Sequence, residues 1–181
     1  MIGNHNMSNG LAAIAAAHHV GIPIQNAVES LTSFKSVKRR MELIFENDRV
    51  RVFDDFAHHP TAISETLTGL RHRVKKEKIV AILEPRSNTM KRGVHKHLLE
   101  DALKHADIAL IFADNNVQWD IKQLRNEKIQ TFDSTEELLA QAVEHLSGQT
   151  SYSNVLIMSN GGFENLYQRL INELSYCDSL L

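Results

Sequence analysis

The sequence has few of the residues that cross-link small proteins, and no segment that could span a membrane. Its 181 residues include one cysteine, three prolines and one tryptophan. A single cysteine cannot form an internal disulfide or supply half of an ordinary structural zinc site. No run approaches the roughly 18 to 20 apolar residues that a bilayer span needs. We therefore expect a globular protein, with the cytoplasm as its default compartment.

The sequence also lacks an excess of charge of either sign. Its 20 basic and 22 acidic side chains give a formal net charge of -2. This balance provides no field that would drive general binding to nucleic acid or to acidic lipid, so we expect no nucleic-acid partner and no membrane partner. Any anion that the protein binds must be held by local groups. The content of 43% hydrophobic and 23% charged residues is typical of a domain with a real core.

The first 40 residues predict two short helices that lack a partner. An alanine-rich run from Asn6 to about Ala17 favours the first helix, which Gly21 and Pro23 end. Apolar residues spaced three or four apart predict the second helix from Ile24 to about Phe34. Two such helices cannot bury both apolar faces in each other. We interpret residues 1–40 as the tail of a domain whose body is missing from this sequence.

From Met41 onward the pattern changes to that of an α/β domain. Leu43 and Phe45 alternate before the turn residues Asn47 and Asp48, which predicts a β-hairpin. Alternating strands and helices follow, so we expect a Rossmann-like, mostly parallel sheet with helices on both faces. The predicted strands are Lys78–Leu83, Ile108–Ala113, Ile129–Phe132 and Asn154–Met158, and the predicted helices are Thr61–His72, His95–His105, Thr135–Leu146 and Phe163–Leu174.

Three unusual polar strings follow predicted strands. They are D-D-F-A-H-H-P-T from Asp54 to Thr61, E-P-R-S-N-T-M-K from Glu84 to Lys91, and S-N-G-G from Ser159 to Gly162. In open α/β sheets, ligands bind in the crevice outside the carboxyl ends of the strands. This placement is the main functional signal that the residues themselves provide.

Candidate nucleotide-binding residues come from three strings. Asn6 and Asn9 share a helix face, and their amides could pair with an adenine edge, although simple N-capping explains them equally well. Arg40 ends a basic triplet at the domain junction and could clamp a phosphate, although most such triplets are only solvated. Asp55 and His58 could converge on a ribose hydroxyl or a phosphate. We assign no metal ligand, because adjacent histidines point apart and no further spacing fits a metal site.

Candidate peptide-binding residues come from the other two strings. Arg86 offers a planar fork suited to a carboxylate, and Ser87 and Asn88 could read an amide or amine beside it. Asn160 lies in a glycine-bearing turn that is equally well explained as a tight turn. The sequence contains no GxxxxGK[ST] phosphate loop and supports no Ser-His-Asp or Cys-His arrangement. We therefore expect no complete catalytic site within these residues.

Five strings, taken in order, carry a resemblance to a known family. H-N-M-S-N, R-R-M-E, D-D-F-A-H-H-P-T, L-E-P-R-S-N-T-M-K and M-S-N-G-G-F resemble the carboxyl-terminal part of the Mur ligase superfamily, the ATP-dependent amide-bond ligases of peptidoglycan assembly. The first three resemble the branch that acts on UDP-N-acetylmuramate. The last two resemble enzymes that attach the recycled tripeptide L-Ala-γ-D-Glu-meso-diaminopimelate to it. The resemblance implies this ligase activity in peptidoglycan recycling, through an acyl phosphate, with ATP and Mg²⁺.

The resemblance also implies roles for individual residues and for the two parts of the chain. Residues 1–40 would be the helical tail of the central ATP-binding domain, and residues 41–181 the carboxyl-terminal domain. Nucleotide binding would involve His5, Asn6, Asn9, Arg40, Asp55 and His58. The diaminopimelate end of the peptide would contact Arg86, Ser87, Asn88 and Asn160.

Two departures and two alternatives accompany this reading. Ser36 stands where the family often has glycine, and Glu164-Asn165 follows Gly162 where a second small pair is usual. The alternatives are a ligase that adds L-alanine to UDP-N-acetylmuramate and a non-catalytic module that holds a peptide or nucleotide. Because the phosphate loop and the magnesium ligands belong upstream in the family, we expect this chain to be a fragment that is inactive alone.

Overall fold

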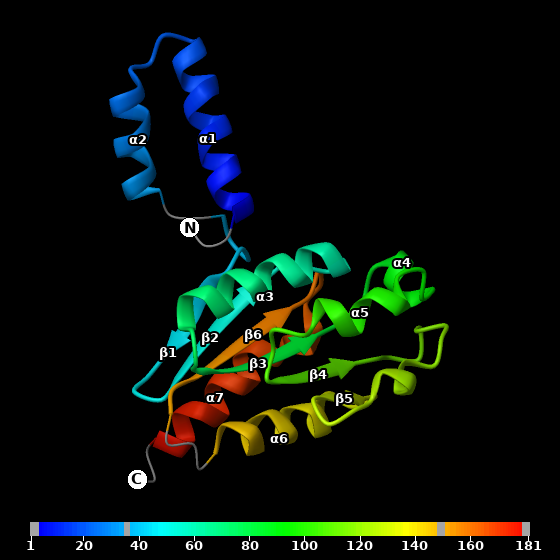
Figure 1. The fold of residues 1–181 in the computed structure, drawn as a ribbon. Helices are drawn as coiled ribbons and strands as arrows, with labels where there is room; N and C mark the ends of the chain where they lie inside the picture. The colour runs from blue at the N-terminus through cyan, green and yellow to red at the C-terminus, as the bar shows by residue number, and fades with distance from the viewer. Residues whose placement is uncertain (1–3, 35–36, 148–150, 179–181) are drawn as a thin grey trace.

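The fold is built on one six-stranded sheet. The structure, a computed structural model, describes residues 4–34, 37–147 and 151–178 (Figure 1). The sheet order is β1-β2-β6-β3-β4-β5; β1 and β2 are antiparallel, and every other neighbouring pair is parallel. The predicted hairpin and mostly parallel sheet are confirmed. The strands are β1 (Glu42–Glu46), β2 (Val50–Asp55), β3 (Lys78–Leu83), β4 (Ile108–Phe112), β5 (Ile129–Phe132) and β6 (Ser153–Met158).

Helices cover both faces of the sheet and create two separate cores. Along β3, Ile79, Ala81 and Leu83 pack with the helices α3 and α5, whereas Val80 and Ile82 pack with α6 and α7. Successive side chains of a strand point to opposite faces, so an uninterrupted apolar strand serves both cores. The helices are α3 (Pro60–Val74), α5 (Lys96–Ala102), α6 (Thr135–Leu146) and α7 (Leu166–Asp178).

A β-bulge changes the expected pattern of β1. Leu43 lies opposite Phe53, but Phe45 lies opposite Val52, so the register shifts between Leu43 and Phe45. Ile44 and Phe45 therefore both pack against the core formed with α6 and α7, while Leu43 is 43% exposed. The prediction that Leu43 and Phe45 follow a simple alternation was wrong, because a bulge inserts one extra residue into β1 between them.

The last predicted helix begins later than expected. Phe163, Glu164 and Asn165 have positive φ angles and form a short turn, η2 (Phe163–Asn165), before α7 begins at Leu166. Left-handed backbone is unfavourable for such residues and needs tertiary contacts to hold it. Phe163 is fully buried with its ring 5.6 Å from that of Phe112, and Glu164 accepts a hydrogen bond of 2.8 Å from Thr135.

Two further short helices were not predicted. They are α4 (Asn88–Lys91), within the polar string that follows β3, and the 3-10 helix η1 (Ile121–Leu124). The helix α5 is also shorter than the predicted His95–His105. Each of the two unpredicted helices has only four residues, so a periodic apolar pattern cannot develop within it.

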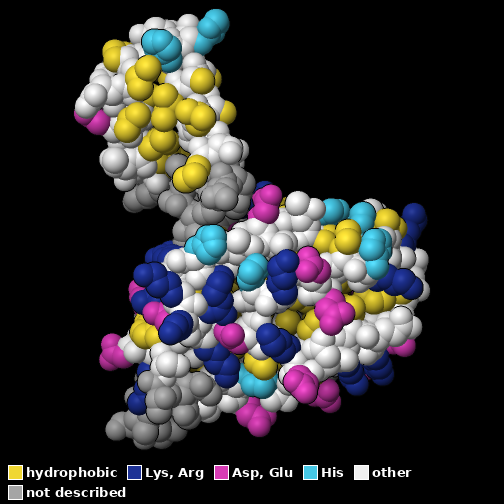
Figure 2. Space-filling view, in the orientation of Figure 1, with side chains coloured by type: hydrophobic (Ala, Val, Ile, Leu, Met, Phe, Trp, Pro, Cys, Tyr) yellow, Lys and Arg dark blue, Asp and Glu magenta, His cyan; other side chains and the backbone are white. Residues whose placement is uncertain are grey.

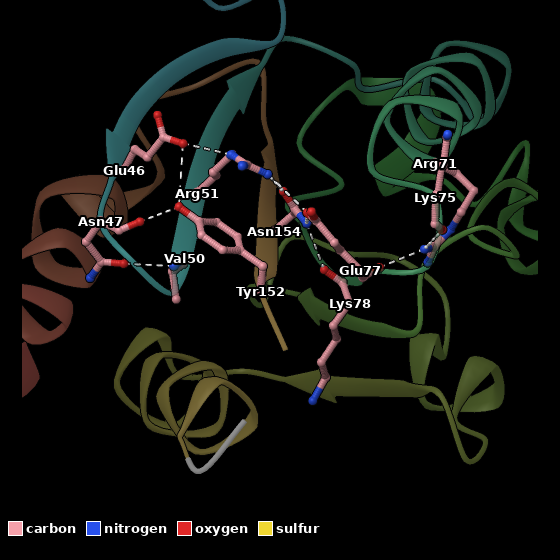
Figure 3. A network of polar contacts seen from close by, with 10 residues as sticks. All are labelled: Glu46, Asn47, Val50, Arg51, Arg71, Lys75, Glu77, Lys78, Tyr152 and Asn154. Atoms are coloured by element: carbon pink, nitrogen blue, oxygen red, sulfur yellow. Dashed lines mark hydrogen bonds and ion pairs between the residues drawn. The ribbon is translucent and has the colours of Figure 1, made fainter. Parts of the chain in front are cut away.

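A polar network joins the carboxyl end of β1 to the amino ends of β2, β6 and β3 (Figure 3). Arg51 of β2 pairs with Glu46 of β1 at 2.8 Å and with Glu77, just before β3, at 3.0 Å. Asn154 of β6 donates to the same Glu77 carboxylate at 2.9 Å. The Arg51 guanidinium also lies 4.2 Å from the centre of the Tyr152 ring. These contacts connect four neighbouring strands at the end of the sheet opposite the predicted ligand crevice.

The first two helices stand apart from the sheet. The helices α1 (Asn4–His19) and α2 (Ile24–Ser33) pack on each other, and α1 also contacts α3 (Figure 1). No described residue of α2 is buried. Large apolar side chains stay exposed on this pair, among them Met7, Leu11, Val20, Ile24 and Val28, and Figure 2 shows hydrophobic side chains gathered there. Within the described residues, no helix combines the length and apolar character needed to cross a membrane.

Adjacent leucines of α5 test the assignment of the core. Leu99 is 1% exposed and Leu98 is 43% exposed. We expect Leu99→Ala to lower the free energy of unfolding by about 2 to 5 kcal/mol, since it leaves a cavity. Leu98→Ala in the same helix is the control and should cost less than about 1 kcal/mol. Urea unfolding of the two variants measures both values, and equal losses would contradict the packing of α5.

Candidate functional site

The carboxyl ends of three neighbouring strands bring the polar strings together. β6 pairs with both β2 and β3, so Met158 lies beside Asp55 on one side and Leu83 on the other. Just past the strand ends, the Ser159 amide donates to the Asp55 carbonyl at 3.2 Å, and the Glu84 amide donates to the Met158 carbonyl at 3.0 Å. The predicted convergence of these strings at one edge of the sheet is therefore present in the structure.

Ser159 is the central residue of this edge. It is fully buried, and its hydroxyl donates to one carboxylate oxygen of Glu84, which is 8% exposed. The same hydroxyl accepts a hydrogen bond of 2.9 Å from the Gly161 amide. Its carbonyl accepts one of 2.6 Å from the Arg39 guanidinium. Ser159 thus connects the end of β3, the turn after β6 and the junction before β1.

Arg39 is a residue that the sequence interpretation did not select. Its Nε lies 3.1 Å from Oδ2 of Asp54, and its Nη2 donates to the Tyr167 hydroxyl at 2.8 Å. Its guanidinium also lies over the rings of Phe56 and Tyr167, at 5.4 and 5.7 Å from their centres. The basic triplet indicated a charge at the junction. Arg39 has a positive φ of 58° and its guanidinium contacts Asp54, whereas Arg40 is exposed, and no local pattern distinguishes the two arginines.

Burial dominates the electrostatics around Arg39. It raises the pKa of Asp54, although the Arg39 charge and hydrogen bond act in the opposite direction. Burial also raises the pKa of Tyr167 to about 12, and the nearby Asp54 carboxylate adds to the effect. The tyrosine is therefore neutral over the physiological range and can donate or accept a hydrogen bond.

The two residues expected near the ribose or phosphates have partners within the chain. Asp55 is 3% exposed, and its two carboxylate oxygens accept hydrogen bonds of 2.8 Å from the amides of Met41 and Ala57. The His58 Nδ1 lies 2.9 Å from the Phe56 carbonyl. Asp55 therefore holds the junction against the end of β2, which positions the loop that carries His58. A contact of either residue with a nucleotide stays a prediction.

The remaining predicted nucleotide-binding residues are Arg40 at the domain junction and three residues at the start of α1. Arg40 is exposed, with its guanidinium 5.8 Å from the centre of the Phe56 ring. Asn6 and Asn9 lie near the start of α1, Asn6 half-buried and Asn9 exposed. His5 belongs to the same helix, but its side chain lies outside the described residues. The described part of the chain holds no group of three or more His, Cys, Asp or Glu side chains that could hold a metal ion.

The loop after β3 presents the predicted peptide-binding residues. The Arg86 side chain is 50% exposed, and its Nη1 lies 3.5 Å from Oε1 of Glu84. Ser87 precedes α4, and Asn88 is exposed at its first residue. A charge pair at 3.5 Å is too long to be a strong hydrogen bond, so Glu84 orients the guanidinium without saturating it.

Asn160 lies next to this loop, in the turn after β6. Its Oδ1 is buried and has no hydrogen-bond partner within the described residues. The neighbouring Gly161 lies against the Arg86 side chain. A buried acceptor without a partner is costly in a folded protein, and a ligand donor could satisfy it. The structure thus brings Arg86 and the turn of Asn160 together, and leaves Asn6 and Asn9 on a separate helix.

The different roles of Arg39 and Arg40 can be tested by stability. Removing one partner of a fully buried ion pair costs roughly 3 to 5 kcal/mol. Because the Arg39 side chain is 29% exposed, we expect Arg39→Ala to lower the free energy of unfolding by about 2 to 3 kcal/mol. Arg40→Ala, the adjacent control, should change it by less than about 0.5 kcal/mol. Denaturant unfolding compares them; similar values would contradict the central position of Arg39.

The raised pKa of Tyr167 predicts a change in stability at alkaline pH. The protonated tyrosine is favoured in the folded state, so its contribution is complete below pH 10 and is lost as pH rises toward about 12. Burial also raises the pKa of Tyr152, but only Tyr167 is raised to about 12, so absorbance titration of the three tyrosines should show a latest component that Tyr167→Phe removes. Tyr176→Phe is the control, and its late component should remain. Loss of the late component in Tyr176→Phe would overturn this assignment.

Comparison with known proteins places this arrangement in a family. Residues 39–161 match the family model described as Mur ligase, glutamate ligase domain. The chain is 41% identical over 177 residues to the UDP-N-acetylmuramate–L-alanyl-γ-D-glutamyl-meso-2,6-diaminoheptandioate ligase of Haemophilus influenzae. This match covers 96% of this chain and 39% of that protein. A UDP-N-acetylmuramate–L-alanine ligase of Magnetococcus marinus is 33% identical over 111 residues, 61% of this chain and 23% of that protein.

A solved structure agrees with the sequence matches. The crystal structure of a murein peptide ligase from Psychrobacter arcticus has a TM-score of 0.71 and 38% sequence identity, covering 95% of this chain and 37% of that one. The chain therefore spans less than two fifths of these relatives' length. The family model matches more than half of this chain, and the matched residues include the polar strings that follow β2 and β3. The chain therefore belongs to the Mur ligase family.

Proposed function

We propose that these residues form the carboxyl-terminal part of an ATP-dependent ligase that joins the tripeptide L-Ala-γ-D-Glu-meso-diaminopimelate to UDP-N-acetylmuramate. The observation that carries this proposal is Arg86 beside the turn of Asn160. An arginine fork suits a carboxylate, and the buried Asn160 oxygen suits an ammonium or amide donor. The end of diaminopimelate carries both groups. The 41% identity to the Haemophilus influenzae ligase, over nearly the whole chain, supports this substrate.

The nucleotide side of the proposal rests on the other predicted residues. Amide, imidazole and guanidinium side chains fit a nucleotide, so His5, Asn6, Asn9, Arg40, Asp55 and His58 are proposed to contact ATP. The described residues do not offer a Mg²⁺ site of three or more acidic or histidine ligands. We therefore propose that most ligands of ATP and Mg²⁺ lie in other parts of the ligase.

We also propose that residues 1–40 belong to the central ATP-binding domain and residues 41–181 to the carboxyl-terminal domain. The uncovered apolar side chains of α1 and α2 support this division, because a second domain would bury them. The family model begins at residue 39, close to the proposed boundary.

The work of this domain in the reaction is positioning. When bound, ATP and Mg²⁺ would supply the activation of the muramyl carboxylate as an acyl phosphate, and attack by the peptide amine would form the amide bond and release inorganic phosphate. Arg86 would hold the distal carboxylate of the peptide, with Ser87, Asn88 and Asn160 reading the groups beside it. Fixing the far end of the peptide holds the bound peptide with its amine toward the activated carboxylate, so the binding energy of this contact lowers the KM for the peptide.

The ligase that adds L-alanine is the second candidate, because the Magnetococcus marinus protein also matches 61% of this chain. The complete ligase that contains these residues should be given ATP, Mg²⁺, UDP-N-acetylmuramate, L-alanine and the tripeptide together. We expect mass spectrometry to show the tripeptide product in large excess. A predominant alanine product would favour the second candidate. No product, with binding of peptide or nucleotide retained, would favour a non-catalytic module.

The role of Arg86 gives a kinetic prediction. Loss of a hydrogen bond to a charged group costs about 1.5 to 3 kcal/mol, so Arg86→Ala should raise the KM for the tripeptide roughly 10- to 100-fold. The kcat should change little, because this contact forms equally in the ground state and the transition state. Arg92→Ala, an exposed arginine of the same segment, is the control. An unchanged tripeptide KM in Arg86→Ala would contradict the assignment.

The chain by itself should not catalyse ligation, because its sequence contains no GxxxxGK[ST] loop to hold the ATP phosphates. We expect no detectable phosphate release or amide product from the 181 residues with all substrates present. Product formation at any rate above the protein-free control would refute this expectation.

A further inference from the structure

The Arg86 side chain crosses the backbone of Gly161 in direct contact. A Cβ atom at residue 161 would lie 2.5 Å from Cδ of Arg86 and 2.6 Å from both Nε and Nη1. Real Cβ atoms do not approach other heavy atoms so closely, so the observed position of Arg86 requires glycine at residue 161. This requirement is steric, because Gly161 is not among the residues with a positive φ.

The Arg86 guanidinium also contacts Glu84, which is bonded in turn to Ser159. Glu84 places Oε1 3.5 Å from Nη1 of Arg86, and its other oxygen accepts the hydrogen bond of the Ser159 hydroxyl. Ser159 is itself held by the Gly161 amide and the Arg39 guanidinium. The carboxylate that orients Arg86 is thus fixed by a buried hydroxyl. The Gly161 amide also donates to that hydroxyl, so one buried side chain connects the backbone under Arg86 to the carboxylate beside it.

The adjacent Gly162 has no such steric requirement. A Cβ at Gly162 would meet no heavy atom within 4 Å, and its φ of -80° suits any residue. The two glycines of the S-N-G-G-F string therefore have different constraints. One provides a close approach for a charged side chain, and the other has space for a methyl group.

We propose that Gly161 is a positioning residue that, together with the Ser159-braced Glu84 carboxylate, fixes the Arg86 guanidinium in the orientation that receives the substrate carboxylate. The inference rests on the proposed function of Arg86. Within the described residues, Glu84 is the only side chain that pairs with the guanidinium, so most of its five N–H donors stay available to a ligand. Fixing an arginine before binding avoids part of the entropy cost of ordering it.

The test compares Gly161→Ala with Gly162→Ala in the complete ligase. In Gly161→Ala the new methyl group displaces the flexible end of Arg86, so the fold should survive and both variants should keep the parent Tm. We expect the tripeptide KM to rise about 10-fold or more in Gly161→Ala, with kcat and the KM for ATP within twofold of the parent. Gly162→Ala should keep all three constants within twofold.

A double variant separates this inference from the function on which it rests. If Gly161 acts through Arg86, then Arg86→Ala combined with Gly161→Ala should have the same tripeptide KM as Arg86→Ala alone. A normal KM in Gly161→Ala, with a raised KM in Arg86→Ala, would overturn the positioning role and leave the proposed function intact. A tripeptide KM in the double variant that rises by the product of the two single effects would also overturn the positioning role of Gly161. A normal KM in Arg86→Ala would overturn the peptide-binding role of Arg86 itself.

Discussion

The position of β6 between β2 and β3 is the constraint on which the candidate site depends. This strand is the last in the sequence, yet it pairs in parallel register with both neighbours along its length. Its carboxyl end therefore delivers Ser159 between Asp55 and Glu84. Because side chains alternate along a strand, a shift of β6 by one residue would turn Ser159 to the other face of the sheet. The apolar side chains of β6 would then point into the wrong cores. The apolar packing of β6 on both faces thus secures the polar geometry at its end.

Arg39 extends this arrangement to the beginning of the domain. It joins the junction before β1 to Asp54, to the Ser159 carbonyl and to the Tyr167 hydroxyl. Its charge offsets part of the desolvation of Asp54, and breaking such a pair would leave a buried carboxylate uncompensated. Arg39, at the start of this domain, is consequently bonded to Ser159, which also binds the Glu84 carboxylate beside Arg86.

The polar groups at the amino ends and at the carboxyl ends of the parallel strands differ in how fully they are bonded within the protein. At the amino ends of β2, β6 and β3, Arg51, Asn154 and Glu77 bond to one another, and Arg51 also pairs with Glu46 of β1, which connects neighbouring strands (Figure 3). At the carboxyl ends, Arg86 is half exposed and Asn160 keeps a buried acceptor without a protein partner. A site works best when a rigid frame supports groups that are left free for the ligand. The carboxyl end meets that condition.

The sequence by itself determined the α/β class, the hairpin and the segments that supply the polar residues, because these follow from local periodicity and from turn residues. Tertiary structure decided the bulge in β1, the left-handed turn at Phe163 and the choice of Arg39 over Arg40 as the arginine that pairs with Asp54. It also decided that Gly161 lies beneath Arg86. These features depend on contacts between residues distant in sequence. Their free energies come from burial and charge pairing, and a local pattern does not contain them.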